Sequence, residues 1–199
     1  MLQARIQDRL LECGTDEAGR GCLAGPVTAA AVILPKDFSH PDLNDSKQLS
    51  TKKREALRTL IEAEAVSWAV VHVMMDEIDR INILNASITA MQRAISQLDP
   101  VPGFVAVDGN RFKAMEGMQH KCVIKGDGKY LHIAAASVLA KTHRDQFMAR
   151  LDQEHPAYAW KQNKGYPTAA HRQAIAQHGP TPYHRMSFRL LPEQLSLDL

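Results

Sequence analysis

The sequence has few cysteines, little net charge and no long apolar run. Its three cysteines, Cys13, Cys22 and Cys122, are scattered, which excludes a disulfide framework and a CxxC metal knuckle. We interpret them as small core residues of a reduced, cytoplasmic protein. A formal net charge of +2 over 199 residues permits a polyanionic partner without requiring one.

The chain also lacks an apolar segment of the roughly 20 residues that a membrane helix needs. The N-terminal MLQARIQDRL is interrupted by Arg5, Asp8 and Arg9, so we expect neither a signal peptide nor a membrane span. Internal repeats and low-complexity segments are absent too. A composition that is 45% hydrophobic is enough to bury one core, and the length suits one globular domain.

Short apolar and β-branched runs alternate with helical patterns along the chain. The former predict strands over residues 10–16, 27–34 and 67–75, one from residue 104 that ends at Asp108, and one from residue 121 that ends near Asp127, with the first two as a hairpin. The latter predict helices over residues 52–65, 78–98, 131–151 and 168–179. Ser50 suits the N-cap of the first helix.

This succession predicts an α/β domain with a central mixed β-sheet flanked by helices. From residue 157 onward the prolines Pro167, Pro180 and Pro182 divide the chain around one short helix. We therefore expect this region to form a helical C-terminal cap on the sheet and not a separate domain.

Acidic residues follow several of the expected strands. Asp16, Asp108 and Asp127 each come after an apolar strand and stand beside a glycine-containing turn, and Glu17 adjoins the first of them. If these carboxylates converge, their mutual repulsion favours a hard divalent cation with oxygen ligands, Mg²⁺ or Mn²⁺. Taken singly, each acid is better explained as an ordinary solvated loop residue.

Two such ions about 4 Å apart would activate a water and stabilise the leaving oxygen of a phosphodiester. The triplet Gly19-Arg20-Gly21 beside the first acids supports a ligand of this kind, because glycines let the backbone approach a ligand closely and Arg20 offers phosphate a planar cation. The alternative is a tight hairpin turn with a solvent-facing arginine.

Seven motifs together resemble the bacterial ribonuclease HII family. In chain order they are DEAGRG, AGPVTAAAVIL, LNDSKQLS, VDGN, KGD, IAAASVLAKTHRD and NKGYPT, spread over about residues 10–188. The resemblance implies a ribonuclease H-like fold. It also implies an endonuclease that cleaves the RNA strand of RNA–DNA hybrids and cuts 5′ of single ribonucleotides embedded in duplex DNA, leaving 3′-hydroxyl and 5′-phosphate ends.

Carried over by position, the family's metal-binding catalytic carboxylates fall on Asp16, Glu17, Asp108 and Asp127. These are the residues that the strand-end argument selects. The resemblance thus implies two-metal catalysis with Mg²⁺ or Mn²⁺.

The resemblance also assigns substrate contacts. It implies that the backbone of Gly19, Arg20 and Gly21 senses the ribose 2′-hydroxyl, which distinguishes RNA from DNA. Tyr166 matches the tyrosine that packs on the neighbouring deoxyribose, and is otherwise a core or lid tyrosine.

Smaller features of the same motifs are less decisive. Lys47 and Lys164 are candidate phosphate contacts, although a solvated lysine is the commoner outcome for either. Asn163 stands where the family often has histidine, which puts one minor contact in doubt. His184 resembles a family feature that either contacts nucleic acid or packs. Lys141 and Asp145, four residues apart, are interpreted as an intrahelical ion pair.

We assign residues 10–190 to the catalytic domain and residues 191–199 to a tail. In that tail Gln194, Leu195, Leu197 and Leu199 resemble the peptide by which bacterial replication and repair proteins dock into the sliding clamp. The alternative is a tail folded back on its own core.

Three other functions remain open. Ribonuclease HIII shares the fold but usually carries an N-terminal substrate-binding domain, for which we expect no room before Leu10. A junction-cutting DNA nuclease would use the same metal chemistry without a 2′-hydroxyl to read. A non-catalytic nucleic-acid or clamp-binding module would leave the acids exposed and idle. Nothing in the sequence indicates an obligate dimer, so we expect a monomer.

Overall fold

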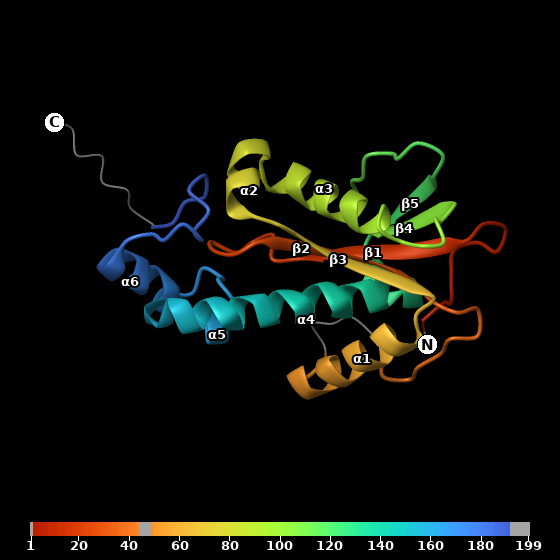
Figure 1. Cartoon of the computed structure of the whole chain (residues 1–199), viewed down its shortest axis with the longest axis horizontal. Coiled ribbons are helices and arrows are strands. Elements are labelled where there is room, and N and C mark those ends of the chain that lie inside the picture. The colour runs from red at the N-terminus through yellow and green to blue at the C-terminus, as the bar shows by residue number, and fades with distance from the viewer. Residues whose placement is uncertain (1, 44–48, 192–199) are drawn as a thin grey trace.

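The computed structural model describes residues 2–43 and 49–191, and a five-stranded sheet lies at its centre (Figure 1). The sheet order is β3-β2-β1-β4-β5. Strand β1 pairs antiparallel with β2 and parallel with β4; β3 is antiparallel to β2, and β5 is parallel to β4. The strands are β1 (Glu12–Ala18), β2 (Val27–Ile33), β3 (Ser67–Val73), β4 (Phe104–Asp108) and β5 (Gln119–Val123).

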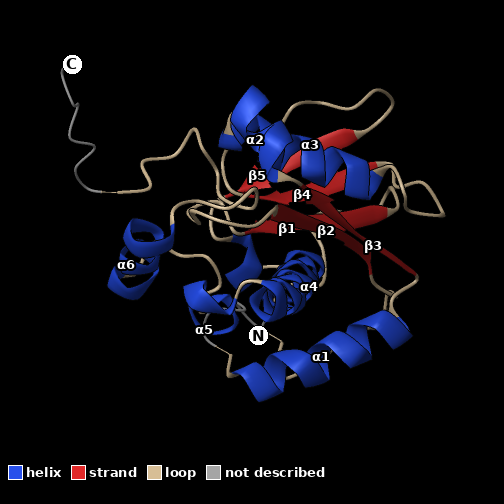
Figure 2. Cartoon of the chain, turned by 60° about the vertical axis from the view of Figure 1, so that its left-hand side comes forward, coloured by secondary structure: helices blue, strands red, loops and turns tan. Residues whose placement is uncertain are grey.

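Helices cover both faces of this sheet. Helices α2 and α3 lie on one face, while the long helix α4 lies on the other with α1 outside it (Figure 2). The α-helices are α1 (Thr51–Glu64), α2 (Met75–Ile81), α3 (Ile83–Ile95), α4 (Leu131–Glu154), α5 (Trp160–Asn163) and α6 (Ala169–His178). Two 3₁₀ turns, η1 (Gly126–Gly128) and η2 (Pro156–Tyr158), flank α4. The expected mixed sheet and first hairpin are confirmed.

The alternation of side chains in β2 separates the two main cores. Ala29 and Ala31 face the core shared with α3, whereas Ala30 and Val32 face the core shared with α4. Close approach of α4 depends on Gly14 in β1, because a Cβ there would lie 2.2 Å from the backbone carbon of His132. The small residue therefore sets the depth at which α4 lies on the strand that carries Asp16 and Glu17.

The apolar stripe over residues 78–98 is not one helix. Asn82 has φ +64 and separates α2 from α3, and its side-chain oxygen accepts hydrogen bonds from the backbone N–H groups of Leu84 and Asn85, both at 3.1 Å. Asparagine tolerates the left-handed region better than most residues. The three- and four-residue spacing continues across the break, so periodicity alone does not reveal it.

The C-terminal cap has a core of its own. Tyr158 and Trp160 stack with ring centroids 5.0 Å apart and pack against Met148 of α4 and Ile175 of α6. His184 lies inside this cap at 1% exposure, so it packs and does not face a ligand. Helices η2 and α5 in the cap were not predicted. Within the described part of the chain, no helix is long and apolar enough to cross a membrane.

Candidate active site

Asp16 and Asp108 lie side by side on neighbouring strands. The parallel register of β1 and β4 pairs Thr15 with Val107, so the next residue of each strand is an aspartate. Strand β1 does not end at Asp16, as the sequence had suggested, but continues to Ala18 in regular pairing with β2. From within this regular strand, Glu17 lines the same cavity as Asp16.

Asp127 reaches the same region through a turn and not from the end of a strand. Strand β5 ends at Val123, and the chain then turns through Lys125, which has φ +55, into η1. The N–H of Gly126 donates a 2.7 Å hydrogen bond to Oδ1 of Asp108, which ties the two segments together. Asp127 follows at 4% exposure.

The electrostatics of Asp16 show that two other acids act on it. Burial raises its pKa well above the usual range, and the charges of Glu17 and Asp108 raise the pKa further. Hydrogen bonds from the Ser137 side chain and from the Glu17 N–H, at 2.7 Å, act in the opposite direction. A charged Asp16 is therefore disfavoured unless a cation is nearby.

The donor set suits a hard divalent cation, since all four predicted ligands are carboxylates. Glu17 is paired with Arg20 at 3.2 Å, and Asp108 accepts the bond from Gly126. In the described residues, no three His, Cys, Asp or Glu side chains are gathered closely enough to form a ready metal site. An ion bound here would draw the acids together from their present contacts.

The glycine turn and Tyr166 share a cavity of about 230 Å³ with the first two acids. Its lining consists of Asp16, Glu17, Ala18, Gly19, Arg20, Gly21, Ser137, Lys141 and Tyr166. Tyr166 is 41% exposed, with Nζ of Lys141 5.9 Å from its ring centre. The structure thus brings together the predicted acids of β1, the predicted turn and the predicted tyrosine.

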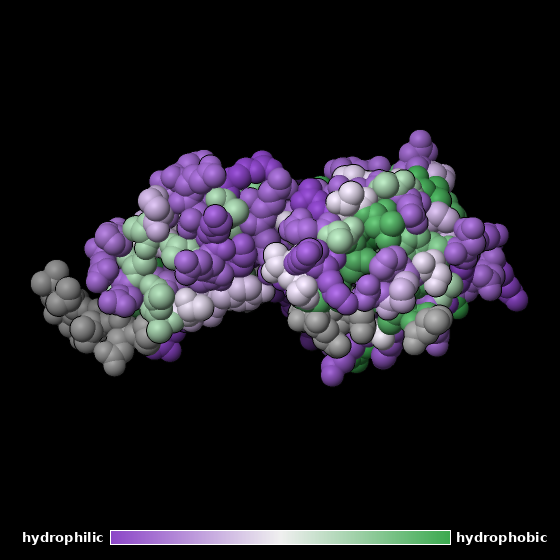
Figure 3. Space-filling view, turned by 90° about the horizontal axis from the view of Figure 1, so that it is seen from below, coloured by the Kyte–Doolittle hydropathy of each residue, from purple (hydrophilic) through white to green (hydrophobic). Residues whose placement is uncertain are grey.

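Lys164 lies in a neighbouring groove and not in this cavity. The groove, about 660 Å³, runs between α1, α4 and α5, and Lys141 lines both spaces. Burial lowers the pKa of Lys164. Figure 3 shows mostly hydrophilic side chains over the end of the molecule that carries α5 and α6. Lys47 lies outside the described residues, as does the tail segment from Gln194 to Leu199.

Comparison with known proteins now identifies the family. The family model for ribonuclease HII matches residues 13–191. The chain belongs to the ribonuclease HII family. Ribonuclease HII of Bacteroides fragilis is 62% identical over 198 residues, which cover 99% of this chain and 98% of that protein.

Solved structures agree with this assignment. The ribonuclease H2 of Pyrococcus horikoshii matches with a TM-score of 0.74 at 24% identity, covering 90% of this chain and 94% of that one. A ribonuclease HII of Archaeoglobus fulgidus, solved in complex with PCNA, matches with a TM-score of 0.75 at 25% identity, covering 94% and 98%. The ribonuclease H-like fold is confirmed.

Ribonucleases H are endonucleases, so this ribonuclease HII family member is an enzyme that acts on RNA–DNA hybrids. The alternatives of a non-catalytic binding module and of a DNA junction nuclease are thereby set aside. The family model and the curated relatives are ribonucleases HII, whereas a ribonuclease HIII structure shares the fold, with a TM-score of 0.70 at 16% identity.

Several residues in and around the candidate site were not predicted from the sequence as part of it. Ser137 and Lys141, four residues apart on α4, line the cavity, and Arg144 follows three residues later on the same helix face. This helical spacing could have been used to predict from the sequence that the three residues share one face of α4. The expected ion pair of Lys141 with Asp145 is confirmed at 2.7 Å. Arg185, buried beneath the glycine turn, gave no sequence signal at all.

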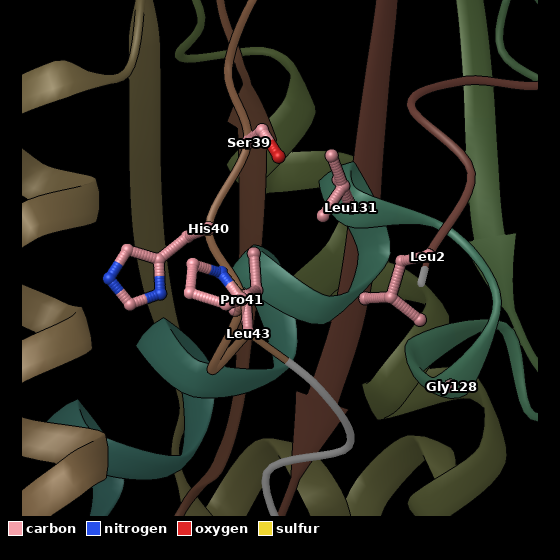
Figure 4. A pocket seen from close by; sticks show the side chains of 7 residues that line it. All are labelled: Leu2, Ser39, His40, Pro41, Leu43, Gly128 and Leu131. Atoms are coloured by element: carbon pink, nitrogen blue, oxygen red, sulfur yellow. The ribbon is translucent and has the colours of Figure 1, made fainter.

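A separate pocket of about 530 Å³ lies near η1 (Figure 4). Its lining is Leu2, Ser39, His40, Pro41, Leu43, Gly128 and Leu131, none of which is a predicted site residue. Gly128 directly follows Asp127, but no lining residue of this pocket also lines the cavity of Asp16 and Glu17. We assign it no role.

Proposed function

We propose that this ribonuclease cuts 5′ of single ribonucleotides embedded in duplex DNA as well as within RNA–DNA hybrids, leaving 3′-hydroxyl and 5′-phosphate ends. One observation carries the proposal: Asp16 and Glu17, the glycine turn and Tyr166 line one cavity. A reacting phosphodiester and the sugar beside it would contact all three at once. This is the arrangement that a nuclease selective for one sugar needs.

We infer that Asp16, Glu17, Asp108 and Asp127 hold the divalent metal, Mg²⁺ or Mn²⁺. When bound, two such ions would supply an activated water and charge stabilisation for the leaving oxygen. The chain's own part is to hold the acids. Ser137 bonds Asp16, and the Gly126 N–H bonds Asp108. Glu17 would exchange its contact with Arg20 for the metal.

Recognition of the ribonucleotide is assigned to the turn of Gly19, Arg20 and Gly21. An added Cβ at Gly21 would meet nothing within 4 Å, so the backbone there is open to a ligand. The 2′-hydroxyl both donates and accepts hydrogen bonds, and backbone groups of the turn can contact it directly. Tyr166, on the same cavity wall, would pack on the adjacent deoxyribose.

The test is cleavage of a DNA duplex that contains one ribonucleotide, beside its all-DNA twin, with Mg²⁺, Mn²⁺ or EDTA. We expect one metal-dependent cut 5′ of the ribonucleotide, no cut in the twin, and a loss of at least about 100-fold for Asp108→Asn. Asp37→Asn, an exposed loop carboxylate, is the matched control and should cut normally. Cleavage of a long hybrid without cleavage at the single ribonucleotide would contradict the proposal.

We also propose that the tail with Gln194, Leu195, Leu197 and Leu199 binds the bacterial sliding clamp. The support is the peptide pattern, together with the Archaeoglobus fulgidus protein that was solved with PCNA, a sliding clamp. Purified clamp should retain the full chain and release one that ends at Glu193. Equal retention of both would exclude the tail as the contact.

A further inference from the structure

Two fully buried arginines lie behind the glycine turn. Arg185, at 0% exposure, donates from Nη2 to the carbonyl of Gly19 at 2.7 Å and from Nη1 to the carbonyl of Arg20 at 2.9 Å. Its Nε donates to the carbonyl of Gly25 at 3.0 Å. One rigid guanidinium therefore holds both ends of the loop that follows β1.

These bonds fix which way the peptide groups of the turn face. In a trans peptide the carbonyl of one residue and the N–H of the next point in opposite directions. With the carbonyls of Gly19 and Arg20 turned toward Arg185, the N–H groups of Arg20 and Gly21 point away from it, to the exposed side. Among the described residues neither N–H has a hydrogen-bond partner.

Arg144 extends the same support to the tyrosine. At 1% exposure it donates from Nη2 to Ala24 at 3.0 Å and from Nε to Pro26 at 2.9 Å, both carbonyls of the same loop. Its Nη1 donates to the carbonyl of Lys164 at 2.8 Å, two residues before Tyr166. The turn and the tyrosine are thus fixed to one side chain of α4.

The charges of this pair are unusual for a merely structural contact. Neither guanidinium forms an ion pair in the described ranges, and burying unpaired charge is costly. Burial, followed by the like charge of Arg144, lowers the pKa of Arg185 to about 10. Two cations behind the turn favour an electron-rich oxygen in front of it, where the two free N–H groups point.

We propose that Arg185 is a positioning residue for sugar selection, an inference that rests on the function proposed above. By turning two carbonyls inward it presents the N–H groups of Arg20 and Gly21 to the 2′-oxygen of the ribonucleotide. Arg144 keeps that pair of donors in register with Tyr166. The preference for ribose over deoxyribose therefore depends on a residue that does not touch the substrate.

The test measures binding in a cleavage-deficient background. The Asp108→Asn chain is titrated in Mg²⁺ with a duplex that contains one ribonucleotide and with its all-DNA twin. The selectivity ratio is the Kd for the all-DNA twin divided by the Kd for the ribonucleotide duplex. It is compared between the Asp108→Asn chain and the Asp108→Asn, Arg185→Lys double variant. Lysine keeps the charge but cannot bond three carbonyls at once. We expect the ratio to fall about tenfold, as for one or two lost hydrogen bonds. A smaller folded fraction would weaken both duplexes equally and leave the ratio unchanged.

Arg172→Lys is the matched control. Arg172 also donates to backbone carbonyls, those of Arg189 and Leu190, but lies in the cap away from the turn. The selectivity ratio of the Asp108→Asn, Arg172→Lys double variant should equal that of the Asp108→Asn parent. A parent with no preference for the ribonucleotide would refute the proposed function itself. A parent preference that survives in folded Arg185→Lys would overturn the inference about Arg185 alone.

A second measurement applies if Arg185→Lys does not fold. In the ¹⁵N-labelled Asp108→Asn chain, the amide resonances of Arg20 and Gly21 are followed as each duplex is added. Both should shift, and exchange more slowly with solvent, with the ribonucleotide duplex but not with the all-DNA twin. Identical responses to the two duplexes would overturn the inference.

Discussion

Gly19 and Gly21 flank the same arginine, but the structure requires them for different reasons. Gly19 has φ +93, and a Cβ there would lie 2.0 Å from Nε of the buried Arg144. Gly21 has neither a left-handed backbone nor any atom within 4 Å of an added Cβ. The protein itself therefore needs the first glycine, whereas only a ligand would need the second.

Alanine substitutions should separate these two requirements. Gly21→Ala should leave the free energy of unfolding within about 0.5 kcal/mol of the parent but lower kcat/KM at a single ribonucleotide by at least about tenfold, because the methyl group occupies the ligand's space. Gly19→Ala should destabilise by about 2–4 kcal/mol through backbone strain and overpacking. Urea denaturation and cleavage kinetics measure the two effects. Full activity of folded Gly21→Ala would show that no ligand approaches there.

Asp16 should be a residue at which stability and activity conflict. Asp16→Asn removes one of the crowded charges, so in EDTA we expect the variant to be more stable than the parent by about 1 kcal/mol. Added Mg²⁺ should raise the Tm of the parent through binding but leave that of the variant unchanged, and the variant should be inactive. Thermal unfolding with and without metal measures this, with Asp37→Asn as a control that follows the parent. Equal metal stabilisation of Asp16→Asn would exclude this aspartate as a ligand.

Residues whose side chains carry the chemistry could be predicted from the sequence. Residues that act by bonding the backbone of other segments could not. Asp16 and Asp108 each end a recognisable apolar stretch beside glycine, so their convergence could be predicted from parallel strands. Arg185 acts on carbonyls of residues about 160 positions away, Gly25 at a separation of 160 and Gly19 at 166. No local pattern encodes such a contact, because any exposed arginine would look the same.

At the scale of elements, the division of the second helical region at Asn82 shows how a capping residue overrides periodicity. Its side chain caps α3, and its backbone ends α2 at positive φ. The apolar stripe on both sides faces one core, so the pattern of buried residues is nearly the same for one helix as for two. Only the preference of asparagine for caps and for left-handed backbone marks the break.

Substitutions at Asn82 should rank by these two properties. Asn82→Ala loses the cap and strains the backbone, so we expect a loss of about 1–2 kcal/mol in the free energy of unfolding. Asn82→Gly keeps the backbone permissive and should lose no more than about half of that. Urea denaturation of the two variants beside the parent gives the ranking. Equal losses would mean that backbone conformation contributes nothing at this position.

The turn η1 illustrates why the position of Asp127 was predicted only approximately. The run from Lys121 to Gly128 looks like one strand, but Lys125 takes a left-handed conformation and ends the extended segment early. Asp127 nonetheless lies in the right region, because the Gly126 N–H bonds Asp108. Hydrogen bonding between segments distant in sequence corrects what local propensity misplaces.

At the scale of the whole molecule, three buried or half-buried histidines make the stability of different parts of the fold depend on pH. Burial lowers the pKa of His72, His132 and His184 to about 4 in each case. His72 of β3 contacts Thr28 at 2.7 Å, His132 of α4 contacts the carbonyl of Val32 in β2, and His184 lies in the cap. Three parts of the fold thus share one response to acid.

The sign of that response follows from linkage. An unfolded histidine takes up a proton near pH 6.5, whereas these folded ones do so only near pH 4, so between these values the unfolded state binds more protons. The free energy of unfolding that depends on these histidines is fully present above pH 6.5. It falls as the pH drops toward 4, by at most about 3 kcal/mol per histidine. His132→Gln should be less stable than the parent at pH 7.5 but lose less on going to pH 5, as measured by urea denaturation at both values. His178→Gln, at an exposed position of α6, should lose as much as the parent, and an equal loss in His132→Gln would show that this histidine is not buried in its neutral form.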